Sequence, residues 1–467
     1  MISSLTWNRV LLLGICLLAA GARAQTTSPR CAGPPSAPAM AARAPAREPT
    51  VQDYDQILRR QPRSAHDYYD HGVLHERMGQ HTSAILDYSQ AIGFDPCLAQ
   101  AYERRGAAYA SLGQFERALK DLDEAIRIDA NSASAYVNRG AAYEAMGQNP
   151  RALADFSQAV ALDPQFAYAY VRRGGSYELT GELDRAVQEY GEAIRISPND
   201  AQAYFFRGRT LIRQRQFERA LGDLDQAIRL DPRDAKAHQS RAAVYAATGD
   251  HARSVEDYSA AIRLDAQYAL AYQGRGDAYA RTGQPERALQ DYAEAIRLNP
   301  KNAYAYYSRG LVHAGKRDYQ RSIEDLNEAI QRKPDYALAL RQRGMNYQKL
   351  EQIERALADF DAAIRLDARD TVALNELAWL LATSRQAQWR DGNRAVELAR
   401  RACNLSGWKV PDLFDTYAAA LAEAGKFEDA AKWQEAALES AEFERAHGDG
   451  ARARLRLYRD GKPYRSP

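Results

Sequence analysis

The sequence predicts an all-α solenoid of about eleven stacked helical hairpins. Three observations lead to this fold class: a period of 34 residues, small residues at three fixed slots of each period, and turn residues at two more. The 467 residues are 46% apolar and 27% charged, so the chain can bury a substantial core. This composition excludes a disordered chain, a small disulfide-stapled module and a multi-pass membrane protein.

Residues 1–24 have the pattern of a secretory signal peptide. Arg9 precedes the apolar run 10–20, and Ala22 and Ala24 are small residues at the positions that a signal peptidase requires. The alternative, an uncleaved anchor, needs about 20 apolar residues to cross a bilayer. We therefore expect cleavage after Ala24, a periplasmic or secreted mature chain, and no stable membrane insertion after cleavage.

The charge of the mature chain is balanced. Without Arg9 and Arg23, the 63 Lys and Arg residues fall to the number of acidic residues, 61. A neutral chain has no long-range field that attracts nucleic acid or anionic lipid, so we expect no nucleic-acid partner.

Two short segments precede the regular part of the chain. Residues 25–49 are rich in Pro and Ala and predict an extended linker. Residues 50–64 follow the repeat pattern with Asp53, Tyr54 and Pro62, and predict half a repeat that forms a second helix.

The repeat is clearest at its small residues. The glycine slot recurs every 34 residues, and a small residue follows it after 12 positions and Ala after a further 7, which predicts two closely packed helices. The glycine slot is occupied by Gly72, Gly106, Gly140, Gly174, Gly208, Ala242, Gly276, Gly310 and Gly344.

Tyrosines and turn residues complete each hairpin. Tyr recurs four positions before the glycine slot and three after it, a spacing that fits helical faces and not a strand. A further glycine between the two helical runs predicts a helix C-terminus, and a proline at the end of many repeats predicts a break. The turn glycines are Gly79, Gly113, Gly147, Gly181, Gly249 and Gly283.

The repeated string, seen for example over residues 271–300, resembles the tetratricopeptide repeat. The pattern gives nine regular repeats over 65–370 and two divergent repeats over 371–440, with a five-residue insertion in the first of these. Residues 441–467 are expected to form a C-terminal cap and tail. The resemblance implies that the hairpins stack into a right-handed superhelix with a concave inner surface.

Arginine is abundant because of the repeat. Eight Arg residues directly precede the glycine slot, and an acidic residue follows each of them 16 positions later. We expect these residues to form a ladder of Arg–carboxylate pairs, each worth about 0–1 kcal/mol if exposed. The pairs begin with Arg105 and Asp121 and end with Arg343 and Asp359.

Two histidines raise the question of a metal site. His71 and His75 are four residues apart on one helical face, as metal ligands often are. However, His71 occupies the Arg slot opposite Asp87, and His75 occupies a Tyr slot. The sequence therefore favours a packed, hydrogen-bonded pair over a transition-metal site, and no metal or cofactor is expected.

The three cysteines that follow the signal segment have different surroundings. Cys403 occupies an aliphatic core slot and is expected to be buried and inert, while Cys31 and Cys97 could pair with each other.

The resemblance also implies a binding surface. In tetratricopeptide repeat proteins, certain first-helix positions face the ligand, and in this sequence those positions are the least repetitive. The expected partner-binding residues are Tyr168, Val171, Phe205, Arg209, Ile212, Arg213, Arg281, Tyr304 and Tyr307. Aromatic anchors beside Arg suit an extended peptide with an acidic group.

The leading functional expectation is a non-enzymatic interaction scaffold of the bacterial periplasm or cell envelope that binds a peptide segment in its groove. The alternative is envelope polysaccharide or peptidoglycan binding by the same groove, which would favour exposed aromatic residues flanked by Asp, Asn or Gln. No G-x-S-x-G motif, phosphate-binding glycine loop or zinc-ligand spacing is present in the sequence, and the repeats leave no room for a separate catalytic domain. We therefore expect no enzymatic activity.

Overall fold

The computed structural model describes residues 62–466. The predicted signal segment, the linker and most of the half repeat lie outside this range. In the described residues every regular element is a helix, as the fold class predicts. The described residues form two compact units, 62–180 and 181–466.

The described part of the first unit contains seven helices. They are α2 (Ala65–Arg77), α3 (His81–Phe94), α4 (Ala99–Ser111), α5 (Phe115–Ile128), α6 (Ala133–Ala145), α7 (Asn149–Leu162) and α8 (Ala167–Thr180).

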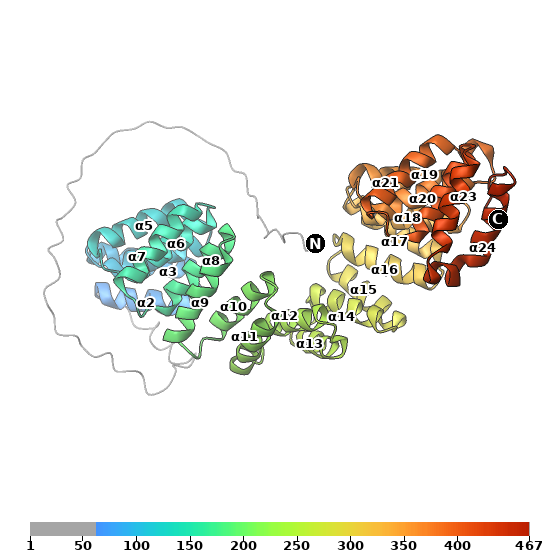
Figure 1. The fold of residues 1–467 in the computed structure, drawn as a ribbon. Helices are drawn as coiled ribbons and strands as arrows, with labels where there is room; N and C mark the ends of the chain where they lie inside the picture. Colours follow the sequence, from blue (N-terminus) through green and yellow to red (C-terminus); the bar gives the residue numbers. More distant parts are fainter. Residues whose placement is uncertain (1–61, 467) are drawn as a thin grey trace. The chain divides into compact units, whose positions relative to one another are not determined.

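The second unit contains the remaining helices (Figure 1). They are α9 (Leu183–Ile196), α10 (Ala201–Arg213), α11 (Phe217–Leu230), α12 (Ala235–Ala247), α13 (His251–Leu264), α14 (Ala269–Arg281), α15 (Pro285–Leu298), α16 (Ala303–Gly315), α17 (Tyr319–Arg332), α18 (Ala337–Lys349), α19 (Ile353–Leu366), α20 (Thr371–Thr383), α21 (Gly392–Leu405), α22 (Pro411–Glu423), α23 (Phe427–Leu438) and α24 (Ala441–Arg459).

Within each unit, consecutive helices pack as hairpins, and each hairpin packs on the next. The first helices of neighbouring repeats also contact each other, as α14 does with α16 and α16 with α18. In the second unit, the first helix of each of these repeats therefore lies beside the first helix of the next, and together they form a row.

The turn between the two helices of a hairpin is left-handed. All six predicted turn glycines have positive φ, from 71° at Gly79 to 87° at Gly249. Three repeats place a larger residue at the same point, and Arg215, Arg317 and Glu351 adopt φ of 60°, 61° and 58°. The left-handed turn is thus kept at Arg215, Arg317 and Glu351, although a positive φ is unfavourable for a residue with a side chain.

The glycine slot is small because a large side chain of the second helix packs onto it. A Cβ at Gly140 would lie 2.7 Å from Cε1 of Phe156, and one at Gly106 would lie 2.8 Å from Cγ of Leu122. The large residue stands 16 positions after the glycine. The close helix contact that the sequence predicts is therefore made by this side chain.

The predicted ladder of Arg–carboxylate pairs is present in both units. Arg139, for example, donates from Nε and Nη2 to Asp155 at 2.9 and 2.8 Å, and Asp155 is only 6% exposed. The carboxylates of these pairs are therefore largely buried, so the energy expected for exposed pairs does not apply to them. The other pairs within a unit are Arg105–Asp121, Arg207–Asp223, Arg241–Asp257, Arg275–Asp291, Arg309–Asp325 and Arg343–Asp359.

Several of these arginines also join neighbouring repeats, which the spacing did not predict. Nη1 of Arg139 donates 2.8 Å to Asp123 on the second helix of the preceding repeat, 16 residues before it. Arg105, Arg241, Arg275 and Arg343 make the equivalent bond to Ser89, Asp225, Ser259 and Asn327. Each such arginine thus connects three helices.

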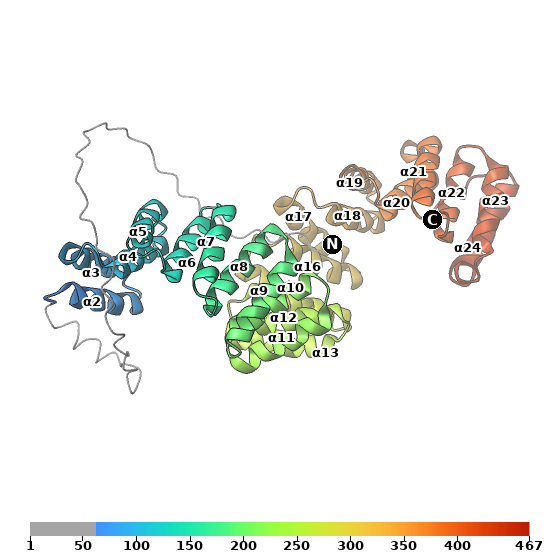
Figure 2. The ribbon, with the colours of Figure 1, turned by 60° about the vertical axis from the view of Figure 1, so that its left-hand side comes forward.

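The second unit ends in a long helix within the segment that the sequence assigns to a C-terminal cap and tail. Residues 441–459 form a 19-residue helix, α24, which packs beside α22 and α23 (Figures 1 and 2). Charged and apolar residues alternate locally before Tyr458, which hides the helical spacing of the buried residues Phe443, Ala451, Leu455 and Tyr458. The five-residue insertion forms a loop with a short 3-10 turn, Ala387–Trp389.

The cysteines differ as the sequence suggests. Cys403 is fully buried, and burial raises the pKa of its thiol to about 12, so this thiol stays protonated and unreactive at neutral pH. Cys97 is disulfide-bonded. Cys31, whose pairing with Cys97 the sequence leaves open, lies outside the described residues.

Candidate functional site

The nine predicted binding residues are divided between the two units. Tyr168 and Val171 lie on α8 of the first unit, and the other seven lie on α10, α14 and α16 of the second. We call the second-unit residues Arg209, Ile212, Arg213, Arg281, Tyr304 and Tyr307 the first-helix face.

Two of the predicted residues belong to the core. Val171 is 6% exposed and Phe205 is 8% exposed, so their side chains offer little surface to a ligand. Phe205 packs against Phe206 with ring centroids 5.5 Å apart. The slot that Phe205 occupies in the repeat does not predict this burial, because the burial depends on which side chains the neighbouring repeat supplies.

The arginines of α10 lie at different depths. The Arg209 guanidinium is half-buried and lies over the rings of Phe206 and Phe205, at 5.3 and 5.8 Å from their centroids. Arg213, one turn further along, is exposed, and Ile212 packs against the core of this repeat. The two phenylalanines thus support a cationic side chain on this part of the face.

A carboxylate surrounded by tyrosines lies between α14, α15 and α16. Tyr292 donates a hydrogen bond of 2.7 Å to one oxygen of Asp277, and Tyr304 donates one of 3.3 Å to the other. Burial raises the pKa of Asp277 above its ordinary value. The ring of Tyr258 on α13 packs onto Gly274, about one turn before Asp277, where a Cβ would lie 2.2 Å from its Cζ.

Sequence reasoning missed Asp277, although it occupies the position directly after the glycine slot. Earlier repeats hold Ala107 and Ala141 there, so an acidic residue at this position was an available signal. Asp277 is held by tyrosines of two other helices, and a fixed spacing does not reveal that arrangement.

The aromatic row continues beyond Asp277. The ring centroids of Tyr304 and Tyr307 lie 6.5 Å apart, and those of Tyr307 and Tyr336 lie 5.0 Å apart. Tyr304 is 43% exposed. Beside it, the amide of Asn302 donates a 2.6 Å hydrogen bond to Gln273, so polar side chains flank the row.

In the first unit, Tyr168 is 47% exposed and is held by its own helix. Arg172 donates a 3.2 Å hydrogen bond to its hydroxyl and also forms an ion pair with Glu144. The position of this aromatic ring is thus fixed by an arginine one turn away.

The predicted histidine pair is also present in the first unit. His71 Nδ1 lies 2.8 Å from Asp87 Oδ2, as the repeat register predicts. His75 Nε2 lies 3.6 Å from the same oxygen. His71, His75 and Asp87 bring three possible metal-ligand atoms within 4.8 Å of one another.

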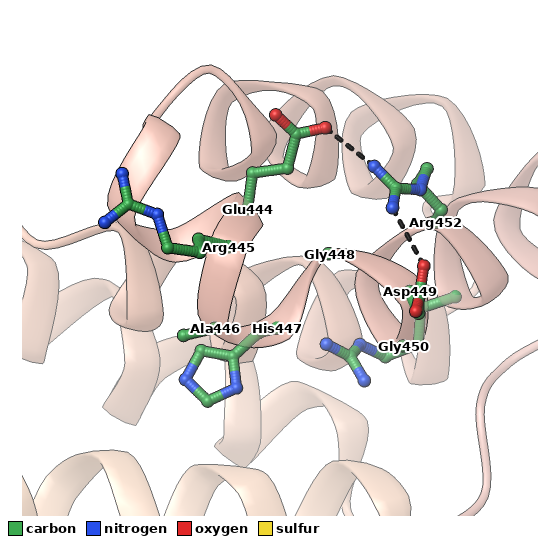
Figure 3. Close-up of a pocket in the computed structure, with 9 residues that line it drawn as sticks. Glu444, Arg445, Ala446, His447, Gly448, Asp449, Gly450 and Arg452 are labelled. Carbon is green, nitrogen blue, oxygen red and sulfur yellow. Dashed lines mark hydrogen bonds and ion pairs between the residues drawn. The ribbon is translucent and has the colours of Figure 1, made fainter.

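A shallow cavity of about 440 Å³ lies along α24 and was not predicted (Figure 3). Arg452 bridges two carboxylates at this cavity, with distances of 2.6 Å to Glu444 and 2.8 Å to Asp449. Arg452 thus pairs with both carboxylates that line this cavity. Among the described helices of the chain, none combines the length and the apolar character needed to cross a membrane.

Comparisons with known proteins agree with the repeat pattern. The tetratricopeptide repeat family matches residues 137–201, 207–269, 274–337 and 339–370, and a TPR repeat model matches residues 106–147. No curated protein sequence matches the chain.

Several solved structures are similar to the chain. YrrB, described as a TPR protein with an unusual peptide-binding site, is 25% identical, with a TM-score of 0.35 over 42% of this chain and 97% of its own. Yeast Tom70 is 16% identical, with a TM-score of 0.39 over 85% of this chain and 96% of its own. The Cut9–Hcn1 hetero-tetramer of the APC/C is 17% identical, with a TM-score of 0.45 over 76% of each chain.

The matched segments together cover more than half of the sequence, and the helical hairpins occur where the repeat pattern places them. The chain therefore belongs to the tetratricopeptide repeat family, whose repeats imply a protein–protein interaction scaffold.

Proposed function

We propose that this protein is an exported, non-enzymatic scaffold that binds an extended peptide segment of another protein on its first-helix face. The family match supports an interaction scaffold, since proteins of this fold are generally non-catalytic. The peptide partner, the binding face and the export are our proposals and go beyond what the family match supports.

The exposure of the first-helix face carries this proposal. Arg213, Arg281 and Tyr304 on this face are exposed. Tyr and Arg are enriched among the residues that dominate binding energies at interfaces. Cationic side chains beside aromatic rings suit a peptide that carries a carboxylate.

A second candidate function, the binding of envelope polysaccharide, is favoured by one observation. Tyr304, Tyr307 and Tyr336 form an aromatic row, and Asp277, Asn302 and Gln273 flank it. Aromatic rings can stack on sugar rings, while amide and carboxylate groups accept or donate hydrogen bonds to hydroxyl groups. Glycan binding would thus use this same part of the face.

Site-specific photo-crosslinking tests the peptide proposal. A photo-crosslinking residue is placed at Arg281 or Tyr304. The matched control is placed at Gln290, an exposed residue on the second helix of the repeat that contains Arg281. We expect both face positions to capture the same polypeptide in the native host and Gln290 to capture none of it. Equal capture from Gln290, or no protein captured at the face, would reject the proposal.

Glycan binding is tested separately with purified peptidoglycan. If the second candidate function is correct, the wild-type chain co-sediments with peptidoglycan, and Tyr304→Ala reduces this co-sedimentation while Gln290→Ala does not. Absence of co-sedimentation would reject glycan binding and leave the peptide proposal standing.

The proposed location rests on the signal pattern of residues 1–24. The mature protein is expected in the envelope or secreted fraction, and mass spectrometry should find Gln25 as its first residue. A cytoplasmic protein that retains Met1 or Ile2 would contradict export.

A further inference from the structure

The first repeat departs from the arginine ladder at a single pair. In the other ladder pairs described above, a guanidinium lies against the carboxylate, but His71 takes that place opposite Asp87. A guanidinium is always charged and cannot bind a metal ion, whereas an imidazole nitrogen can bind either a proton or a metal ion. The first repeat has thus replaced a permanent cation by a group that can bind a proton or a metal ion.

A second histidine converges on the same carboxylate. His75 lies one turn after His71 on α2, and its Nε2 is 3.6 Å from Oδ2 of Asp87 on α3. The side chains of His71, His75 and Asp87 are 16%, 17% and 15% exposed. They are therefore shielded from bulk water but can be reached by a small ion.

Gln80 orients the second histidine. Nδ1 of His75 lies 2.6 Å from Oε1 of Gln80. Since a side-chain amide oxygen only accepts hydrogen bonds, Nδ1 carries the proton and donates it. In the neutral ring, Nε2 then has a free lone pair that faces Asp87. A hydrogen bond of this kind to the far ring nitrogen commonly orients metal-binding histidines.

The distances fit a metal ion. In a tetrahedral zinc site with bonds of about 2.1 Å, the ligand atoms lie about 3.4 Å apart. The 3.6 Å separation of His75 Nε2 from Asp87 Oδ2 is close to that value. The 2.8 Å contact of His71 Nδ1 with the same oxygen would have to widen by about 0.6 Å around the ion. A cation between these atoms would also remove the repulsion between the lone pair of His75 Nε2 and the carboxylate of Asp87.

We propose that His71, His75 and Asp87 bind one divalent transition-metal ion of the zinc class. Two imidazole nitrogens and one carboxylate oxygen form a donor set that suits Zn²⁺ and leaves one position for water or a partner's side chain. The ion would link α2 to α3 and thus stabilise the first repeat. This proposal is independent of the peptide-binding proposal.

Metal titration of the full mature chain tests the site. The protein is dialysed against a chelator and then titrated with Zn²⁺ by calorimetry and with Co²⁺ by visible absorption, which reports tetrahedral nitrogen and oxygen ligands. We expect one ion per chain. His71→Ala, His75→Ala and Asp87→Ala should abolish stoichiometric binding, and Gln80→Ala should weaken it about 10-fold or more.

His238 supplies the matched control. Its Nδ1 lies 3.2 Å from Asp257, but Arg241 already holds that carboxylate at 2.7 Å, so His238→Ala should leave metal binding unchanged. Circular dichroism checks that each variant is folded. The proposal is overturned if the wild-type chain binds no ion, or if folded His71→Ala and His75→Ala variants bind it as tightly as the wild type.

Discussion

The guanidinium of Arg454 on α24 donates two hydrogen bonds, each of 2.9 Å, to the carboxylate of Asp415 on α22. The amide of Gln434 on α23 donates a third, of 2.7 Å. Burial raises the pKa of Asp415, while Arg454 acts in the opposite direction. One buried carboxylate thus joins the last three helices.

Removal of Arg454 should therefore unfold the C-terminal end locally. Arg454→Ala leaves the Asp415 carboxylate buried without its cation, a change that typically costs about 3–5 kcal/mol. Because stability in a repeat array is transmitted mainly between neighbours, hydrogen exchange should accelerate in α22, α23 and α24 and little in α10. Arg452→Ala, at an exposed arginine of the same helix, is the control, and equal acceleration by both variants would contradict this role.

The arginine ladder predicts that two arginines of the first unit, Arg139 and Arg127, contribute unequally to stability. Arg139→Ala removes bonds to Asp155 and to Asp123 and should cost about 2 kcal/mol, because Asp155 stays buried. Arg127→Ala removes an exposed pair with Glu124 and should leave the stability nearly unchanged. Urea denaturation followed by circular dichroism measures both, and similar midpoints for the two variants would show that the ladder contributes nothing special.

Two glycines of one repeat should resist substitution for different reasons. Gly140→Ala places a Cβ 2.7 Å from the ring of Phe156, and such overpacking costs about 1–3 kcal/mol. Gly147→Ala meets no atom within 4 Å but has φ of 73°, and the backbone strain should cost about 1–2 kcal/mol.

A compensating substitution separates the two causes. Phe156→Leu should offset part of the cost of Gly140→Ala and none of the cost of Gly147→Ala. The thermal midpoints of the single and double variants give the comparison, and equal rescue of both would contradict the steric explanation for Gly140.

The turn at Glu351 predicts a stabilising change. Its φ of 58° is strained for a residue with a side chain, so Glu351→Gly relieves about 1–2 kcal/mol while the flexibility of glycine takes back about 0.5–1 kcal/mol. A small rise in the thermal midpoint is expected. A fall would show that Glu351 makes a contact worth more than the strain.

Asp277 predicts a pH dependence of stability. Burial raises its pKa in the folded chain, so the folded state holds the proton to higher pH than the unfolded state does. The contribution of Asp277 to stability is therefore greatest at low pH, and it is lost as pH rises through the raised pKa. Asp277→Asn cannot ionise, so its thermal midpoint relative to the wild type should increase from pH 3 to pH 7.

The exposed Asp335→Asn variant serves as the control for this pH series, since its difference from the wild type should stay nearly constant. A constant difference for Asp277→Asn as well would mean that the hydrogen bonds from Tyr292 and Tyr304 keep the carboxylate ionised.

The sequence by itself determined the fold class, the hairpin turns and the partners in the ladder. These features recur at fixed spacing, and a spacing of 16 residues across a helical hairpin brings the same two slots together in every repeat. The positive φ of the turn glycines and the burial of Cys403 follow from the same local logic.

Only the tertiary structure shows which of the residues that depart from the repeat pattern contact each other. The depth of Val171 and Phe205, the tyrosines around Asp277, and the orientation of His75 by Gln80 all depend on side chains that depart from the repeat. The same holds for α24, which is held by Arg454 and Asp415, 39 residues apart in the chain. A periodic pattern encodes the contacts that every repeat shares, whereas contacts made once depend on the packing of neighbouring helices and are visible only in three dimensions.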